Sequence, residues 1–311
     1  MRMLEAQYQE ILRACAGIEL RRNELLSRHT SFRVGGPAAL MAFPKTAAEL
    51  RQLLQCAHAL GLAPRILGAG TNVLALDAGV DGLVICLKDA LCGLRALDSG
   101  AIEVFAGESM AKAAVFARDL GLTGLEFAHG IPGTVGGGVY MNAGAYGGEM
   151  KQVVQSVTVL TMQGDERTYT GEQSAFGYRV SAYQQMDCVI VSARLRLRPG
   201  EQAEITAQMR ALMEKRRASQ PLELPSAGST FKRPAGYFAG QLIEQAGLKG
   251  QGCGGAMVST KHAGFVVNAG GATAADILNT IRLVQTRVKE ASGVTLEPEV
   301  RIWQEEEICN S

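Results

Sequence analysis

Two glycine-rich segments have the residue types that bind phosphate through the backbone. The first is Gly68-Ala69-Gly70-Thr71-Asn72, which follows the short apolar stretch 65–67. Its amides could form a concave phosphate-binding nest, with added hydrogen bonds from the Thr71 and Asn72 side chains. An ordinary tight turn explains the same residues equally well. Val73 excludes the Gly-x-Gly-x-x-Gly dinucleotide fingerprint, and no Gly-Lys-Ser/Thr of a P-loop follows.

The second segment, 130–138, is the more specific of the two. It reads Gly130-Ile131-Pro132-Gly133-Thr134-Val135-Gly136-Gly137-Gly138, and Asn142-Ala143-Gly144-Ala145-Tyr146-Gly147 follows it. So many glycines between apolar residues are expected where a flat or anionic ligand lies directly against the backbone. The alternative, a flexible surface loop, fits poorly with the embedded Val139 and Met141.

Three polar segments could act on a bound ligand. Arg179, after Phe176, Gly177 and Tyr178, suits a bidentate carboxylate contact. Ser229 stands near Lys232 and Arg233, and Glu299 stands on the last apolar segment beside Arg301. Taken separately, each is better explained as a surface ion pair or a structural residue. No Gly-x-Ser-x-Gly elbow surrounds Ser229, so the sequence does not support a nucleophilic serine.

Histidines and cysteines predict no metal site. His29, His58, His129 and His262 do not pair at metal-ligand spacing, and the seven cysteines include no Cys-x-x-Cys pair. His262 precedes an expected strand and could contact a ligand. The cysteines are expected to be reduced thiols of a cytoplasmic protein.

The first two hundred residues alternate helix and strand patterns. Residues 46–60 predict a helix that begins at a Thr46/Glu49 capping box and ends at Gly61, and residues 109–120 predict one capped by Ser109. Strands are expected at 65–67, 82–87, 101–106, 153–162 and 189–197. A continuous helix is not expected across the glycines of 130–148. This order is typical of α/β or α+β folds.

A second part is expected after a boundary near 200–222. Residues 201–219 predict a helix with Ile205, Met209, Leu212 and Met213 inward and a charged end, 214–217, whose cations suit the helix dipole. Pro221 and Pro225 then break the chain. Helices near 237–246 and 273–291 follow, with strands at 264–268 and at 294–303, the latter interrupted by Pro298.

Composition limits the class of protein. The 311 residues are 47% hydrophobic and carry a net charge of +1, which excludes a disordered chain and argues against nucleic-acid binding. No uncharged apolar run approaches the ~20 residues needed to span a bilayer. Polar residues within the first apolar stretch, from Glu5 to Glu10, argue against a signal peptide. The 37 glycines favour a small-molecule site framed by main chain.

Taken in order, these motifs resemble the UDP-N-acetylenolpyruvoylglucosamine reductase family. The resemblance runs from about residue 23 to 303 and includes the segments 29–37, 68–72, 130–137, 142–147, 178–179, 228–229 and 299–301. It implies an α+β fold: an FAD-binding region of the vanillyl-alcohol-oxidase type, made of two α+β subdomains, plus a separate α+β substrate-binding domain. The expected boundaries are 1–88, 89–200 and 201–293, with 294–311 returning to the first subdomain.

The resemblance also implies roles for single residues. FAD, bound non-covalently, would contact Gly68, Ala69, Gly70, Thr71, Asn72, Gly130, Ile131, Thr134, Gly136, Gly137 and Arg301. NADPH would reduce it, and the enolpyruvyl group of the UDP-sugar would then be reduced in cell-wall precursor synthesis. Arg179 would stabilise charge on the substrate carboxylate, Ser229 would donate a proton, and Glu299 would polarise the carboxylate region or orient Ser229. Tyr178, Lys232, Arg233 and His262 would bind the UDP-sugar.

Two alternatives remain open. One is another FAD-dependent oxidase of the same fold, although the turn at 68–72 lacks the histidine by which many such enzymes attach flavin. The other is a non-catalytic nucleotide-binding protein, against which Arg179, Ser229 and Glu299 argue. The chain resembles the family's shorter type, and His129 departs from the small residue common there. A monomer acting on a small molecule, without nucleic acid or membrane, is expected.

Overall fold

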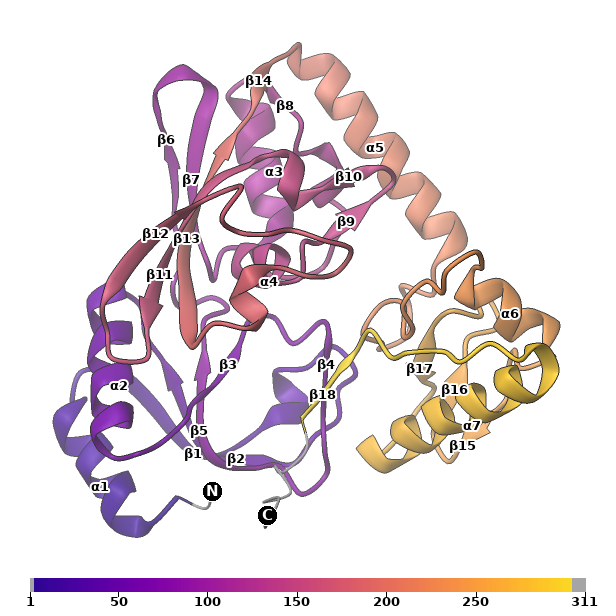
Figure 1. The fold of residues 1–311 in the computed structure, drawn as a ribbon, viewed down its shortest axis with the longest axis horizontal. Coiled ribbons are helices and arrows are strands. Elements are labelled where there is room, and N and C mark those ends of the chain that lie inside the picture. Colours follow the sequence, from indigo (N-terminus) through magenta and orange to yellow (C-terminus); the bar gives the residue numbers. More distant parts are fainter. Residues whose placement is uncertain (1–2, 304–311) are drawn as a thin grey trace.

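The computed structural model describes residues 3–303. Figure 1 shows two mixed α/β parts side by side, coloured from indigo to magenta, and a third part in orange and yellow. Helix α5 (Gln202–Ser219) runs from the second part to the third, and strand β18 (Arg301–Trp303) leads back to the first. The chain therefore passes from the second part to the third along α5 and returns to the first part at β18. Residues near 301–303 thus lie beside β4 (Val73–Ala75) of the first part.

The first part is built on a four-stranded sheet of order β1-β2-β5-β3, in which β1 pairs antiparallel to β2 and the other neighbours are parallel. Helix α1 packs on α2 beside it. Thr46 caps α2 by accepting a hydrogen bond from the Glu49 amide, as the sequence predicts. The elements are α1 (Glu5–Ala14), β1 (Glu19–Leu25), η1 (Leu26–Arg28), β2 (Pro37–Phe43), α2 (Ala47–Ala59), β3 (Arg65–Leu67), β4 (Val73–Ala75) and β5 (Val80–Cys86).

The second part is a five-stranded antiparallel sheet of order β12-β11-β13-β7-β6. Ser109 caps α3 through the Lys112 amide, which confirms that prediction. The main elements are β6 (Leu94–Ala96), β7 (Ala101–Phe105), α3 (Met110–Asp119), α4 (Val135–Tyr140), β11 (Val154–Thr161), β12 (Glu166–Thr170) and β13 (Cys188–Arg196). The short elements are η2 (Asp98–Gly100), β8 (Leu122–Thr123), η3 (Glu126–Ala128), β9 (Gly144–Ala145), β10 (Gly148–Glu149), η4 (Met150–Gln152), η5 (Ala182–Gln184) and β14 (Arg198–Pro199).

In the third part, α7 packs on a small antiparallel sheet, β15-β16-β17, and α6 packs against α7. Its elements are α6 (Ala239–Gln245), β15 (Gly252–Cys253), β16 (Ala256–Val258), β17 (Val266–Asn268) and α7 (Ala274–Ser292). Helix α7 buries Ile277, Ile281, Val284 and Val288, the four positions that its spacing predicts.

Three clusters of buried residues reflect this arrangement, of which the smallest, with Leu26, Met41 and Val84, lies within the first part. One cluster of buried residues joins the first and second parts and includes Ile205 and Met209 of α5. A second cluster holds the third part together with Phe32, Val34 and Leu74 of the first. The domain boundaries at 88, 200 and 293 stay a prediction. The packing of α5 on the second part favours the later edge, near 222, of the predicted boundary region.

One local expectation was wrong in extent. The predicted strand at 294–303 is shorter, because only Arg301–Trp303 forms a strand, parallel to β4, while Pro298 makes an isolated antiparallel bridge with Phe231. As expected, no continuous helix spans the glycines of 130–148, and only the short helix α4 forms there, capped by Thr134 and anchored by its buried valines. Of the two arginines in the last turn of α5, Arg216 is buried and Arg217 is exposed. Among residues 3–303, no helix has the length and apolar character needed to cross a membrane.

Candidate active site

The segment 68–72, called here the glycine turn, presents backbone amides that are not used by the fold. Within residues 3–303, the amides of Ala69, Gly70, Thr71 and Asn72 donate to no other group. Gly70 has a φ of +62°, and a Cβ there would lie 2.1 Å from the His29 carbonyl oxygen. Only glycine fits this backbone, and a buried donor without a partner is unfavourable unless a ligand accepts its hydrogen bond.

The segment 130–137, the glycine loop, lies directly against this turn. Thr71 Oγ1 donates to the Pro132 carbonyl at 3.0 Å, and a Cβ at Gly68 would lie 2.6 Å from Thr134 Oγ1. The amides of Gly130, Gly133 and Thr134 also have no acceptor within residues 3–303. Two segments about sixty residues apart in sequence therefore form one surface of free amide donors, the chemistry that suits a diphosphate.

Other glycines of the loop have a packing role. The Gly136 amide donates to the Ala106 carbonyl at 2.9 Å, and a Cβ on Gly136 would lie 2.8 Å from the Ala106 Cβ. The Gly137 amide donates to Thr134 Oγ1 at 3.3 Å, the N-cap contact of α4. The close approach that the sequence suggests at Gly136 is thus made by the chain itself.

The glycine turn also holds the C-terminal segment. Asn72 Nδ2 donates to the Glu299 carbonyl at 3.1 Å, and the Arg301 amide donates to the Asn72 carbonyl at 3.0 Å. The Arg301 side chain extends to Tyr140 of α4, and its Nη2 donates a hydrogen bond to the Tyr140 hydroxyl at 2.6 Å. These contacts bring Glu299 and Arg301 to the amide surface, where Arg301 adds a cation.

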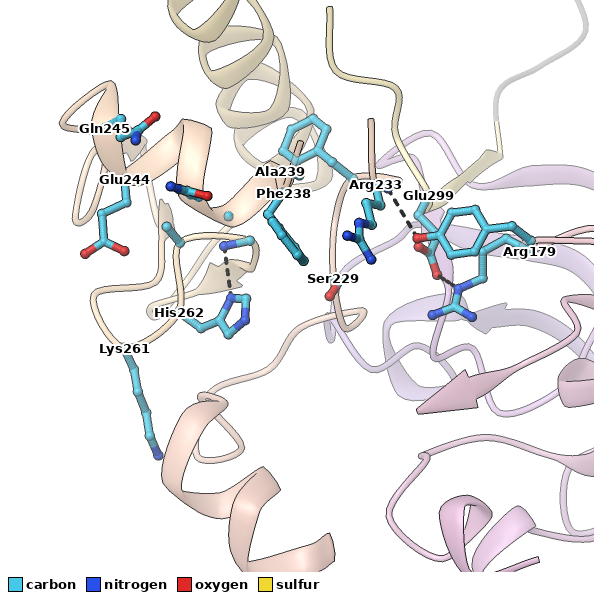
Figure 2. Close-up of a pocket in the computed structure, with 16 residues that line it drawn as sticks. Arg179, Ser229, Arg233, Phe238, Ala239, Glu244, Gln245, Lys261, His262 and Glu299 are labelled. Carbon is cyan, nitrogen blue, oxygen red and sulfur yellow. Dashed lines mark hydrogen bonds and ion pairs between the residues drawn. The ribbon is translucent and has the colours of Figure 1, made fainter. Parts of the chain in front are cut away.

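Beside this surface lies a cavity of about 600 Å³, shown in Figure 2. Its walls come from the 178–179 turn, the 229–245 segment with α6, the 261–264 segment and Glu299. The cavity therefore lies where the third part, the 178–179 turn of the second part and the segment around Glu299 come together. A cavity of this size accommodates a small organic ligand.

Arg179 and Glu299 form an ion pair at one end of the cavity. Arg179 Nε donates to Glu299 Oε1 at 2.6 Å, and Nη2 makes a longer contact of 3.4 Å with the Gly144 carbonyl. Nη1 has no partner within residues 3–303. Glu299 therefore holds the Nε edge of the guanidinium, and Nη1, with Nη2 beside it making only a long contact, can reach a ligand carboxylate.

The turn that carries Arg179 is held by two polar side chains, of which one is fully buried. Arg179 has a left-handed φ of +58°, within a tight turn closed by the Gly177–Val180 bridge. Gln184 Nε2 donates to the Arg179 carbonyl at 3.0 Å, and the fully buried Asn142 donates to the Gly177 carbonyl at 2.8 Å. This unusual backbone conformation at a cavity wall is typical of functional sites.

Burial dominates the electrostatics of Glu299. It raises the pKa of the Glu299 carboxyl above its ordinary value, although the charges of Arg179 and Lys232 oppose the shift. The side chain is only 13% exposed. Its protonation state therefore changes at a higher pH than that of a solvated glutamate.

Ser229 lies on an exposed loop at the cavity wall, supported by a buried neighbour. Thr230 Oγ1 accepts a hydrogen bond from the Val266 amide at 2.8 Å, and the Thr230 amide donates to the Gly264 carbonyl at 2.9 Å. The Ser229 hydroxyl has no hydrogen-bond partner in residues 3–303 and lies in Figure 2 between His262 and Arg179. Within the described residues, the carboxyl of Glu299 contacts Arg179 and does not contact Ser229.

The remaining predicted ligand contacts divide into two groups. Tyr178, Arg233 and His262 line the cavity; the Arg233 guanidinium stacks on the Phe238 ring at 4.0 Å, and its amide donates to the Tyr178 hydroxyl at 3.2 Å. Burial lowers the pKa of His262, whose Nδ1 accepts from the Gly264 amide at 3.1 Å. The Lys232 ammonium instead pairs with Glu297 at 3.2 Å and does not line the cavity.

The third part is docked on the first by polar contacts. Both carboxylate oxygens of Asp77 accept hydrogen bonds from the first amides of α7, those of Ala274 and Ala275, at 2.8 and 2.9 Å. Asn268 Nδ2 donates to the Phe32 carbonyl at 3.0 Å. A carboxylate at a helix N-terminus is stabilised by the helix dipole, so these contacts set the position of Ser229 relative to Arg179.

Sequence reasoning missed several residues of the site. Asn142 and Gln184 support the Arg179 turn, Tyr140 contacts Arg301, and Phe238 with Gln241 forms part of the cavity wall. Asn142 belongs to the 142–147 motif, so the sequence marks it as a candidate, but the sequence does not show that it supports the Arg179 turn. The others carry no local signal, since their contacts come from distant segments.

Comparisons with known proteins give a consistent result. The family model of the FAD binding domain matches residues 38–170, and that of the C-terminal domain of UDP-N-acetylenolpyruvoylglucosamine reductase matches residues 220–303. The chain is 47% identical over 296 residues to the UDP-N-acetylenolpyruvoylglucosamine reductase of Limosilactobacillus fermentum, covering 95% of this chain and 98% of that protein.

Two further relatives cover similar lengths. The protein of the same name from Geobacillus kaustophilus is 44% identical, over 98% of this chain and all of its own length. Among solved structures, UDP-N-acetylenolpyruvylglucosamine reductase from Thermus caldophilus is similar, with a TM-score of 0.80 and 36% identity over 92% of this chain and 100% of that one. The similarity thus includes every segment that forms the cavity and the amide surface.

Proposed function

Because this chain belongs to the UDP-N-acetylenolpyruvoylglucosamine reductase family, we propose that it reduces the enolpyruvyl group of the UDP-sugar with NADPH as the reductant and FAD as the carrier. It is an FAD-dependent oxidoreductase of peptidoglycan precursor synthesis. The observation that carries the finer proposal is the meeting of Arg179, Glu299 and Ser229 at one cavity beside the amide surface.

The amide surface fits the cofactor. The unpaired donors of the glycine turn and of Gly130, Gly133 and Thr134 would hold the FAD diphosphate, with Ile131 beside them and Arg301 as a nearby cation. Gly136 and Gly137 would act through packing and the cap of α4. The turn holds no histidine, so binding is proposed to be non-covalent. When bound, FAD supplies hydride transfer from NADPH to the terminal carbon of the enolpyruvyl double bond.

The side chains would control the charge and the proton. As the terminal carbon gains hydride, negative charge spreads from the adjacent carbon to the substrate carboxylate as an enolate. The terminal nitrogens of Arg179 would stabilise that charge, with the guanidinium held in place by Glu299. Ser229 would donate its hydroxyl proton to the adjacent carbon, a step open to a weak acid because the developing carbanion is strongly basic and close.

The UDP end would lie along the wall formed by Tyr178, Arg233 and His262. The guanidinium of Arg233 suits a diphosphate, and its stacking on Phe238 fixes its plane. Lys232 would reach the same phosphates after exchanging its exposed pair with Glu297. The cytoplasmic location and the monomeric state stay predictions of the sequence.

The test follows the flavin spectrum of the purified protein. We expect a yellow protein that bleaches under anaerobic NADPH and regains its colour when UDP-N-acetylglucosamine enolpyruvate is added. A yellow protein that is reoxidised only by oxygen would instead show another FAD-dependent oxidase of this fold. A protein that stays colourless with excess FAD would contradict an FAD-dependent reaction altogether.

Glu299→Gln is expected to remove the acid limb of the pH profile of kcat/KM. In the wild type, activity should fall as pH falls through the raised pKa of Glu299, because the protonated carboxyl no longer holds Arg179 by charge. The neutral amide keeps the hydrogen bond but cannot titrate, so the variant should be slower and flat over that range.

The same substitution gives an independent check on stability. Because the folded pKa lies above the unfolded one, the contribution of Glu299 to stability is largest below pH ~4.5 and falls as pH rises through the folded pKa. Glu299→Gln should reduce that fall in unfolding free energy. An unchanged acid limb in the variant would show that another group controls it.

A further inference from the structure

The turn that presents Arg179 to the cavity has little apolar packing of its own. Tyr178 and Val180, which flank Arg179, are 53% and 47% exposed. Arg179 has a left-handed φ of +58°, a conformation that a residue other than glycine keeps only where its surroundings enforce it. Hydrogen bonds to the backbone of the turn must therefore hold Arg179 in place.

One side chain, that of Gln184, binds the carbonyl of Arg179 itself. Its Nε2 donates to the Arg179 carbonyl at 3.0 Å and to the Tyr140 carbonyl at 2.9 Å. An amide nitrogen carries two hydrogens, so both contacts can form at once. Without Gln184, the Arg179 carbonyl would have no donor within residues 3–303, and the neighbouring Tyr140 carbonyl would repel it.

Gln184 is itself anchored between two fixed elements. It ends η5 and directly follows Tyr183, which is buried in the core. The carbonyl of Tyr140 belongs to the last residue of α4, where helix carbonyls have no partner in their own helix. Ser181 Oγ also donates to this carbonyl, at 2.7 Å. The Gln184 amide therefore connects Arg179 both to α4 and to the buried η5.

Helix α4 extends this connection to the amide surface. The helix is capped by Thr134 of the glycine loop, and the Tyr140 hydroxyl at its other end accepts from Arg301. Figure 2 shows the Arg179 guanidinium beside Glu299, whose Oε1 accepts from Arg179 Nε at 2.6 Å. A shift of the turn relative to α4 would move this guanidinium, and a displacement of ~1 Å near reacting atoms can lower a rate about 100-fold.

We propose that Gln184 is a positioning residue for the reduction, which holds the Arg179 carbonyl against the end of α4. It thereby keeps the Arg179 guanidinium where negative charge develops on the substrate carboxylate. The inference rests on the proposed function, which assigns that charge to the enolpyruvyl group. Gln184 is not among the described residues that line the cavity, so it acts through Arg179 and not by contact with a ligand.

The experiment compares Gln184→Met and Gln184→Glu with the control Gln185→Met. Methionine keeps the length of the side chain and glutamate keeps its shape, but neither methionine nor an ionised carboxylate can donate to the two carbonyls. Two variants of different chemistry are used so that a folding defect in one leaves the other to decide. Gln185 is the adjacent exposed glutamine, whose side chain has no hydrogen-bond partner within residues 3–303.

The expected loss is confined to one half of the reaction. In both Gln184 variants, the limiting rate of flavin reoxidation by the enolpyruvyl UDP-sugar should fall about 10- to 100-fold. Flavin reduction by NADPH and the affinity of the oxidised holoenzyme for UDP should stay unchanged, because neither depends on the charge that Arg179 stabilises. Gln185→Met should match the wild type in all three. A wild-type rate of reoxidation in both Gln184 variants would overturn the inference.

A double variant tests whether the effect passes through Arg179. In the Arg179→Lys background, Gln184→Met should change the rate of reoxidation by no more than about twofold, because the planar fork whose position Gln184 sets is already lost. If the two losses multiply instead, Gln184 acts elsewhere and the inference is wrong.

Amide hydrogen exchange of the oxidised holoenzyme gives a measurement that needs no substrate. The Gly177 amide donates to the Val180 carbonyl at 2.9 Å, and the Val180 amide donates back at 3.3 Å. Both amides should exchange faster in Gln184→Met than in the wild type, while α7 keeps its protection. Unchanged exchange at the turn would contradict the positioning role. Faster exchange in the variant, combined with a wild-type flavin that the UDP-sugar does not reoxidise, would support the hold on the turn and refute the proposed function instead.

Discussion

Replacing Arg179 by lysine is expected to lower kcat by about 10²- to 10³-fold, the usual cost of losing one preorganised donor to a developing negative charge. The substitution keeps the charge but removes the planar fork. In the wild type, Arg179 Nε donates to Glu299 at 2.6 Å, while the terminal nitrogens can donate to the substrate carboxylate. A single ammonium group cannot hold Glu299 and the carboxylate in the same geometry. Stopped-flow measurement of flavin reoxidation by the UDP-sugar gives the readout.

Arg51→Lys is the matched control for this prediction. Arg51 has the same kind of contacts, with Nε donating to the Gly164 carbonyl and Nη2 at 3.0 Å from Glu166, but it lies on α2, outside the cavity. Its substitution should leave kcat unchanged and cost at most about 1 kcal/mol of stability. Wild-type turnover in Arg179→Lys would remove Arg179 from charge stabilisation.

Ser229→Ala is expected to separate the two halves of the reaction. Reduction of the flavin by NADPH should continue at nearly the wild-type rate, because the Ser229 hydroxyl makes no contact that supports the fold. Reoxidation by the enolpyruvyl substrate should slow by about 10²- to 10⁴-fold, the range that general acid catalysis supplies. The two rates are measured separately under anaerobic conditions.

Ser292→Ala provides the control, since it removes a hydroxyl of the third part whose only hydrogen bonds within residues 3–303 are to the Val288 carbonyl and from the Val294 amide. Both half-reactions should keep their wild-type rates in that variant. An equal loss of both rates in Ser229→Ala would contradict the role of proton donor and point to a general disturbance of the site. Replacement of Ser229 by cysteine would then show whether another weak acid restores the slow step.

The local elements of the fold could be predicted with few errors. The N-caps at Thr46 and Ser109 and the buried face of α7 depend on residues within one or two turns of one another, so the sequence shows them directly. The glycine turn was also visible. The sequence could not decide between a phosphate-binding turn and an ordinary tight turn at 68–72. Only the structure distinguishes them, through the close approach of the His29 carbonyl to Gly70 and the unpaired amides of the turn.

The short C-terminal strand shows where local patterns fail. Residues 294–303 alternate as a strand should, but only Arg301–Trp303 forms a strand, because β4 is itself three residues long, and Pro298 makes a single antiparallel bridge with Phe231. Lys232 shows the same limit for side chains. The residues around Lys232 in the sequence suggest phosphate binding, yet its ammonium group forms an ion pair with Glu297 on the adjacent segment. Whether a segment forms a strand, and whether a cation is free to bind a ligand, both depend on neighbouring residues in space, and the local sequence does not show which residues these are.

By itself, the sequence determined the class of protein, the order of the helices and strands, and the set of motifs that resembles one reductase family. It did so because caps, periodicity and motif spacing are short-range properties. The tertiary structure alone decided that Arg179 meets Glu299, 120 positions away, that Gly136 packs on Ala106, and that Arg216 is buried beside Gly130. These contacts depend on the docking of α7 on Asp77 and on the pairing of β18 with β4, where residues distant in sequence compete for the same space and the same hydrogen-bond partners.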